Sequence, residues 1–160
     1  MQASLSGLGG SCGRFRLTVS IMRRQHRIRR VKKGYDIFIN AAAISDFTVD
    51  RRSEKIRSGH TLQLELKSVP KLTDIVRKKY PRLFVVCFKA ETHTTHEALI
   101  ELARSIPVDL VVANDVTVRG MGTEDNEIYI VNSHVERHEG DKAYLAVKIV
   151  DAIVQRMNRA

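Results

Sequence analysis

Two groups of side chains in this sequence have the chemistry to hold a phosphorylated ligand. The first contains the amide of Asn40 and the carboxylate of Asp46, with the alanines 41–43 between them. An amide and a carboxylate can hydrogen-bond a sugar or a base, and small side chains let a ligand lie against the backbone. Tight packing beneath a helix would require the same alanines, so composition alone leaves both interpretations open.

The second group is cationic and lies in a long polar segment, residues 47–60. Lys55 and Arg57 occur there, with Arg51 and Arg52 upstream. Cations on a mobile lid suit phosphate neutralisation and oxyanion stabilisation, although charged loop residues are more often only solvated. Because loops of this length in compact domains are often functional, we predict a lid.

Four further residues are candidates for metal or hydroxyl binding. Glu91 and Asp115 follow predicted strands and could hold Mg²⁺, although a capping or structural role fits them equally well. His93 and His96 have a spacing that metal ligands can have, but the sequence offers no evident third ligand. No Walker loop and no Gly-x-Gly-x-x-Gly motif occurs.

The elements that position these residues follow from hydrophobic patterning. Continuous apolar runs at 35–43, 83–88 and 109–113 predict strands buried on both faces. Alternation predicts a half-exposed strand at 61–66, and two short strands are expected at 127–131 and 135–138. Helical periodicity predicts helices over 70–79 and 95–104, the second with a core face of Ala98, Leu99, Leu102 and Ala103. Asp141 would cap a last helix whose inward-facing residues are Tyr144, Leu145, Ile149, Ile153 and Val154.

This order of elements predicts an α/β fold, Rossmann-like and three-layered, with a mainly parallel sheet and a C-terminal hairpin and helix. Ligands of such sheets bind beyond the carboxyl ends of the strands. Residues 40–46, 88–92 and 114–115 occupy those ends, so we expect the pocket there.

Charge is distributed unevenly along the 160 residues. Residues 1–33 contain nine of the 27 basic side chains and no acid, so the remaining 18 balance the 18 acids of residues 34–160. We therefore expect a basic, poorly ordered arm or remnant at 1–33 and one α/β domain at 34–160, with no specific nucleic-acid function. No apolar run is long enough to span a membrane. A buried, reduced Cys87 would suit the cytoplasm.

Taken together, the motifs resemble the phosphopantothenate–cysteine ligase family, the C-terminal part of the bifunctional flavoprotein of coenzyme A biosynthesis. The resemblance covers about residues 35–157. Four blocks carry it in the family's order and spacing: 40–47 (NAAAISDF), 54–57 (EKIR), 86–92 (VCFKAET) and 109–115 (DLVVAND).

The resemblance implies a ligase that activates the carboxylate of 4′-phosphopantothenate with a nucleoside triphosphate, CTP favoured over ATP. Pyrophosphate would leave with the help of Mg²⁺, and the amine of cysteine would attack the acyl-nucleotide. Lys55 matches the catalytic lysine of the family's flap, and Ala42, Ala43 and Asn114 would lie at the acyl intermediate. The nucleotide-binding residues would be Asn40, Ala41, Ala42, Asp46, Val69, Pro70, Lys71, Leu72 and Phe88.

The family also has a glycine-rich N-terminal half, to which nothing in residues 1–33 is similar, and lysines in the helix after the Phe88 block. The corresponding stretch here, about 102–106, offers only Arg104. The resemblance implies a homodimer. A missing N-terminal half or a decarboxylase partner would complete the enzyme. Two alternatives are an inactive nucleotide-binding or dimerisation module derived from the ligase, and an unrelated dehydrogenase fragment, which the missing dinucleotide loop disfavours.

Overall fold

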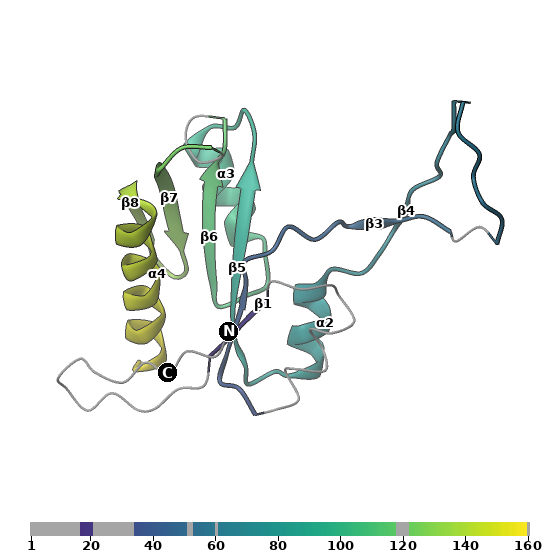
Figure 1. The fold of residues 1–160 in the computed structure, drawn as a ribbon. Coiled ribbons are helices and arrows are strands. Elements are labelled where there is room, and N and C mark those ends of the chain that lie inside the picture. Colours follow the sequence, from purple (N-terminus) through teal and green to yellow (C-terminus); the bar gives the residue numbers. More distant parts are fainter. Residues whose placement is uncertain (1–16, 21–33, 51–52, 60, 118–121, 160) are drawn as a thin grey trace.

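The computed structural model describes residues 17–20, 34–50, 53–59, 61–117 and 122–159. Their main feature is a six-stranded sheet in the order β1-β2-β5-β6-β7-β8 (Figure 1). The strands are β1 (Leu17–Ser20), β2 (Ile37–Asn40), β5 (Phe84–Glu91), β6 (Leu110–Asp115), β7 (Asp125–Val131) and β8 (Val135–Asp141). The helices are α2 (Leu72–Lys79), α3 (His96–Arg104) and α4 (Lys142–Met157).

In the order of the sheet, the first four strands pair in parallel. The pairings of β6 with β7 and of β7 with β8 are antiparallel. Strands β7 and β8 form the expected C-terminal hairpin, and α4 follows directly. The predicted fold class is thereby confirmed, with a mainly parallel sheet and a terminal hairpin and helix.

Apolar side chains on the two faces of the sheet build a three-layered core. On one face, Ile39, Val86 and Ile130 pack with Leu145 and Ile153 of α4. The opposite face divides between two helices, because one cluster contains residues of α2 and another contains residues of α3. Alternation along each strand explains this arrangement, since successive side chains of a strand point to opposite faces.

Capping and ion pairing fix where the helices begin and how they attach. The Thr95 hydroxyl accepts the Ala98 N–H at the start of α3, and the Asp141 carboxylate accepts the Tyr144 N–H at the start of α4. Helix α2 is attached through Arg77, which pairs with the carboxylate just before β6. That carboxylate, of Asp109, also accepts the Val85 N–H at 2.7 Å.

Three sequence expectations differ from the structure. Residues 61–66 are exposed and form no strand, because no strand among the described residues pairs with them. In α3, two of the four expected core residues, Leu99 and Ala103, are buried, whereas Ala98 and Leu102 are exposed. Tyr144 of α4 is 44% exposed rather than inward-facing.

Strand β1 was not predicted. It lies within residues 1–33 and pairs in parallel with β2 along Leu17–Ser20. The sheet therefore includes part of the segment expected to form an arm, and the other residues of 1–33 lie outside the described ranges.

A long excursion leaves the sheet between β2 and α2 (Figure 1). From here on, the arm means this excursion, residues 47–68, and not the N-terminal segment 1–33. The two ends of the arm pair with each other as the antiparallel strands β3 (Phe47–Thr48) and β4 (Lys67–Ser68). The ammonium group of Lys67 in β4 also lies 2.5 Å from the carboxylate of Asp50. Its tip projects far from the sheet (Figure 1). In the described ranges, no helix has the length and apolar character to cross a membrane.

Candidate functional site

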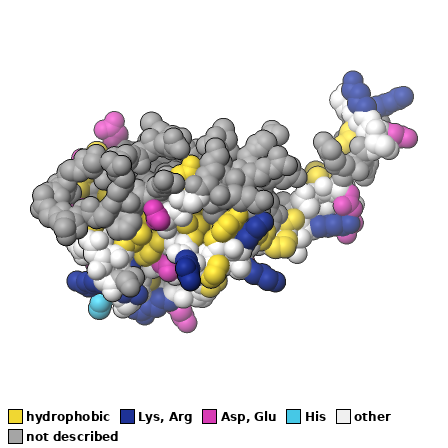
Figure 2. Space-filling view, turned by 90° about the horizontal axis from the view of Figure 1, so that it is seen from below, with side chains coloured by type: hydrophobic (Ala, Val, Ile, Leu, Met, Phe, Trp, Pro, Cys, Tyr) yellow, Lys and Arg dark blue, Asp and Glu magenta, His cyan; other side chains and the backbone are white. Residues whose placement is uncertain are grey.

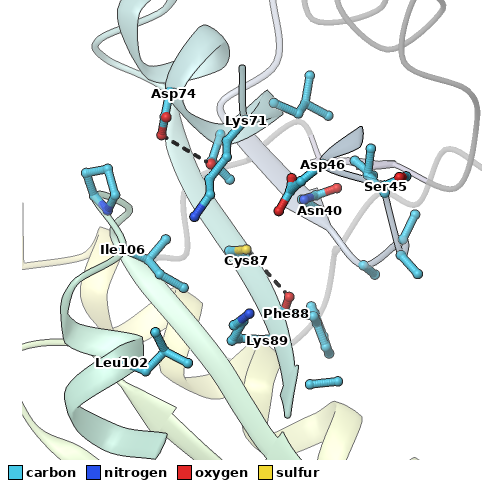
Figure 3. Close-up of a pocket in the computed structure, with 18 of the residues that line it drawn as sticks. Asn40, Ser45, Asp46, Lys71, Asp74, Cys87, Phe88, Lys89, Leu102 and Ile106 are labelled. Atoms are coloured by element: carbon cyan, nitrogen blue, oxygen red, sulfur yellow. Dashed lines mark hydrogen bonds between the residues drawn. The ribbon is translucent and has the colours of Figure 1, made fainter. Parts of the chain in front are cut away.

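A cleft of about 880 Å³ opens over the carboxyl-terminal ends of the parallel strands, between α2 and α3 (Figure 3). It lies where the topology predicts it, because helices flank the sheet there and leave the strand ends uncovered. The lining consists of Asn40, Ala41, Ala42, Ala43, Ile44, Ser45, Asp46, Val69, Pro70, Lys71, Leu72, Thr73, Asp74, Cys87, Phe88, Lys89, Ala90, Leu102, Ser105, Ile106, Pro107 and Asn114.

The structure brings together all the residues to which the sequence assigned nucleotide or acyl binding. Asn40–Asp46, Val69–Leu72, Phe88 and Asn114 come from four separate segments and line this one cleft. The binding of a nucleotide and an acyl group by these residues stays a prediction.

The floor of the cleft is built from neighbouring strands. Asn40, the last residue of β2, lies beside Cys87 of β5 and is only 8% exposed. Burial raises the pKa of the Cys87 thiol, although a hydrogen bond with Asn40 and the charges of Lys89 and Lys71 oppose this effect. The thiol is therefore held in its neutral form, as expected for a buried reduced cysteine.

One side of the cleft is cationic. Lys71 is the N-cap of α2, and its side chain makes no capping hydrogen bond. The partial positive charge of a helix N-terminus and the lysine therefore lie at the same edge of the cleft. Lys89 projects from β5 and pairs with Glu91 at 2.6 Å. Figure 3 shows the two lysines on either side of Cys87.

The side of the cleft that faces Asn40 and Asp46 across the lysines is apolar (Figure 3). Leu102 at the end of α3, together with Ile106 and Pro107 after it, faces the cleft (Figure 3). Leu102 is 38% exposed for this reason, which the helical periodicity could not distinguish from a core position. An apolar wall beside two cations suits a ligand with a flat or hydrophobic part and an anionic part.

The structure places Lys55 away from the cleft, on the exposed part of the arm. Arg57 is also exposed there, and Arg51 and Arg52 lie outside the described residues. The two ends of the arm nevertheless meet at the cleft, where the Val69 N–H donates to the Asp46 carbonyl at 2.8 Å. Movement of the arm would therefore start at residues that line the cleft.

Asp115 has a structural role in the loop beside the cleft. Its carboxylate accepts the Thr94 N–H at 2.9 Å and both the N–H and the hydroxyl of Thr117. These hydrogen bonds lower the pKa of Asp115 to about 2. The adjacent His93 has a φ of 52°, and its N–H donates to the Thr117 hydroxyl. Asp115 and Glu91 lie outside the lining of the cleft.

His96 pairs with a carboxylate of the β7–β8 hairpin. Its ring lies 3.5 Å from the Glu127 carboxylate, which also accepts from Tyr129 and Arg137 at 2.7 Å each. The hydrogen bond from Arg137 lowers the pKa of Glu127, whereas burial is the main cause that raises the pKa of Tyr129 to about 12. Among the described residues, no three His, Cys, Asp or Glu side chains are grouped to hold a metal ion.

Sequence reasoning missed several lining residues. Lys89 lies inside one of the four motif blocks, but no role was assigned to it. Leu102 was expected in the core, and Ile106 carried no expectation of its own. Sequence reasoning also missed the pair Tyr144-x-x-x-Lys148, a spacing that some dehydrogenases use. Both residues are on α4, which packs on the face of the sheet opposite α2 and α3, so this pair is not part of the cleft.

Comparison with known proteins agrees with this geometry. The family model described as "DNA/pantothenate metabolism flavoprotein C-terminal domain" matches residues 18–157. The chain is 45% identical over 104 residues to the coenzyme A biosynthesis bifunctional protein CoaBC of Thermococcus kodakarensis, an alignment that covers 62% of this chain and 25% of that protein. The sequence resemblance is thereby confirmed.

Two solved structures share the fold. The DNA/pantothenate metabolism flavoprotein from Streptococcus pneumoniae has a TM-score of 0.64 and 21% identity, over 84% of this chain and 65% of that one. A Cab2 mutant in complex with phosphopantothenate-cysteine has a TM-score of 0.52 and 20% identity, over 75% of this chain and 44% of that one. The chain spans about a quarter to a third of the length of the curated relatives that it matches.

Proposed function

Because the chain belongs to the family of DNA/pantothenate metabolism flavoprotein C-terminal domains, we propose that it provides the nucleotide-binding part of a phosphopantothenate–cysteine ligase in coenzyme A biosynthesis. The substrates are 4′-phosphopantothenate, cysteine and a nucleoside triphosphate, with CTP preferred. The relative named as a coenzyme A biosynthesis protein supports the pathway, and the Cab2 complex with phosphopantothenate-cysteine supports the substrates.

One structural observation carries the proposal. Four segments that are far apart in the sequence meet in a single cleft at the carboxyl ends of parallel strands. These segments hold small residues, an amide, a carboxylate and lysines. A nucleotide needs these groups, for close backbone approach, for hydrogen bonds to sugar and base, and for charge neutralisation.

The reaction proceeds in two steps. An oxygen of the phosphopantothenate carboxylate attacks the α-phosphorus of the nucleotide, the bond between the α- and β-phosphates breaks, and pyrophosphate leaves. The amine of cysteine then attacks the acyl carbon, loses a proton and displaces the nucleoside monophosphate. Ala42, Ala43 and Asn114 would border the acyl group, and Lys71 at the start of α2 would neutralise phosphate charge.

Lys55 would act from the arm. A cation that arrives only when the arm closes would stabilise charge that develops during acyl transfer, and closure would exclude water from the acyl-nucleotide. The ends of the arm, Asp46 and Val69, line the cleft, so closure would follow from a change at the nucleotide itself.

The described lining of the cleft offers two carboxylates to a Mg²⁺ ion. Asp46 and Asp74 are the two carboxylates of the described lining, and Mg²⁺ is commonly held by one or two carboxylates together with substrate phosphates. When bound, the ion would neutralise phosphate charge. The residues Asp46 and Asp74 would orient it relative to Lys71.

The assembly in which the chain works is also proposed. Large apolar side chains are exposed along the arm: Phe47, Val49, Ile56, Leu62, Leu64 and Leu66. Because contiguous exposed apolar surface favours association, the arm supports a homodimer. An N-terminal half or a decarboxylase partner would complete the enzyme in the cytoplasm.

Pyrophosphate release tests the proposal. The chain would be incubated with Mg²⁺, 4′-phosphopantothenate and either CTP or ATP, with and without cysteine. We expect release that depends on phosphopantothenate, and more of it with CTP. Nucleotide binding without release would instead identify a derived binding module, and no nucleotide binding at all would refute the proposal.

A further inference from the structure

The charge inside the cleft is concentrated on few residues. Among its described lining residues, Lys71 and Lys89 are the only cations, whereas α3 contributes the apolar Leu102 and the segment after it contributes Ile106. A nucleoside triphosphate carries several negative charges, and burying them without cations is costly. Neutralisation by residues of the cleft itself therefore depends on these two lysines.

Lys89 is well placed for this role. It projects from β5 just beyond the last residue paired with β2, where β5 still pairs with β6 and Lys89 lies opposite Ala113. The lysine side chain is 35% exposed, and the ammonium group lies 2.6 Å from the Glu91 carboxylate. Lys71 and Lys89 lie on either side of Cys87 on the floor (Figure 3).

The Lys89–Glu91 pair raises a choice between two roles. A partly exposed ion pair contributes little to stability, and Glu91 lies outside the cleft lining whereas Lys89 lies within it. The lysine can therefore exchange one carboxylate oxygen for a phosphate oxygen at little cost. An ammonium group has three donors, so a phosphate can also join the pair without replacing it.

We propose that Lys89 is a phosphate ligand of the nucleotide, and that together with Lys71 it supplies the cationic charge that α3 does not. This inference rests on the proposed function, because it assigns a role within the same cleft. It predicts that the contribution of Lys89 depends on the phosphates and not on the base or ribose.

Titration of the chain with CTP, with ATP and with cytidine separates the contribution of the phosphates to the binding affinity from that of the base and ribose. For Lys89→Met we expect an increase of about tenfold or more in the dissociation constant for CTP, as for loss of one charge-assisted hydrogen bond. Cytidine binding should change less than twofold, and Lys89→Arg should restore most of the CTP affinity. Lys79→Met, on the exposed end of α2 outside the cleft, removes the same charge and should have little effect.

Glu91→Gln distinguishes a ligand from a structural pair. If Lys89 binds phosphate, Glu91→Gln should bind CTP at least as tightly as the unmodified chain, because the lysine loses a competing anion. Equal weakening by Glu91→Gln and Lys89→Met would show that the ion pair only supports β5, and would overturn the inference.

Other outcomes are equally decisive. Unchanged CTP affinity in Lys89→Met, with weakening in a parallel Lys71→Met variant, would assign the phosphates to Lys71 alone and reject the role of Lys89. If the unmodified chain binds neither CTP nor ATP, the proposed function itself fails and this inference with it. The two failures are therefore distinguishable by the behaviour of the unmodified chain.

Discussion

Replacing Lys55 by Gln tests whether the arm takes part in the reaction. The side chain is exposed and absent from the cleft lining, so nucleotide affinity should change less than about twofold. Lys55 lies nine positions after Asp46, which is at the cleft. A chain of that length reaches about 30 Å when extended, which is enough for the arm to fold back over the cleft.

The effect on turnover should be much larger. Removal of one group that stabilises developing negative charge in a transition state costs about 3–4 kcal/mol, or roughly 10²- to 10³-fold in rate. We therefore expect pyrophosphate release coupled to amide formation to slow by about that factor in Lys55→Gln, at an unchanged dissociation constant for CTP.

A matched control separates a specific lysine from the charge of the arm. Arg57→Gln removes an exposed cation two residues away on the same arm and should retain most of the turnover. Normal turnover in Lys55→Gln would refute the role of the lysine. An equal loss in both variants would show that the net charge of the arm, and not Lys55, is responsible.

Three further predictions concern packing, pH and assembly. Leu99→Ala should lower the free energy of unfolding by about 2–5 kcal/mol because the side chain is 1% exposed, whereas Leu102→Ala should cost less than about 1 kcal/mol; urea unfolding measures both. Since the pKa of Asp115 is lowered to about 2 from 3.8, its contribution to stability is present above pH 3.8 and lost as pH falls toward 2. Asp115→Asn should make the unfolding midpoint depend less on pH between pH 3.8 and pH 2. An unaltered pH profile would contradict this. Leu64→Asp with Leu66→Asp should convert a dimer to a monomer in light scattering, and a persistent dimer would exclude the arm as its interface.

Much of the sheet and the position of the cleft could be predicted from sequence, because buried parallel strands leave continuous apolar runs. The strands that contain Ile37, Val86 and Val112 were expected on this basis, and the structure buries these residues almost completely. The carboxyl ends of these strands then had to meet at one edge, which located the cleft. Asp141 was expected to cap the last helix and does so, since the signal for a cap is local.

The rest depended on contacts that local patterns do not encode. Residues 61–66 alternate like a strand, yet a strand also needs a partner, and none pairs with them here. Leu102 fits the apolar face of α3, but that face is wider than the sheet covers, so Leu102 borders the cleft. Strand β1 was hidden because basic composition obscured a short extended segment. The position of Lys71 and Lys89 on either side of Cys87 follows only from how α2 packs on β5 (Figure 3).

The most direct test of the central claim is an amide NMR titration of the ¹⁵N-labelled chain with CTP and Mg²⁺, repeated with ATP. If the cleft is the nucleotide site, the shifts should be concentrated in residues 40–46, 69–74 and 87–90, while the amides of α4 on the other face of the sheet stay in place. Shifts concentrated on α4 or β8, or no saturable shifts with either nucleotide, would contradict the account.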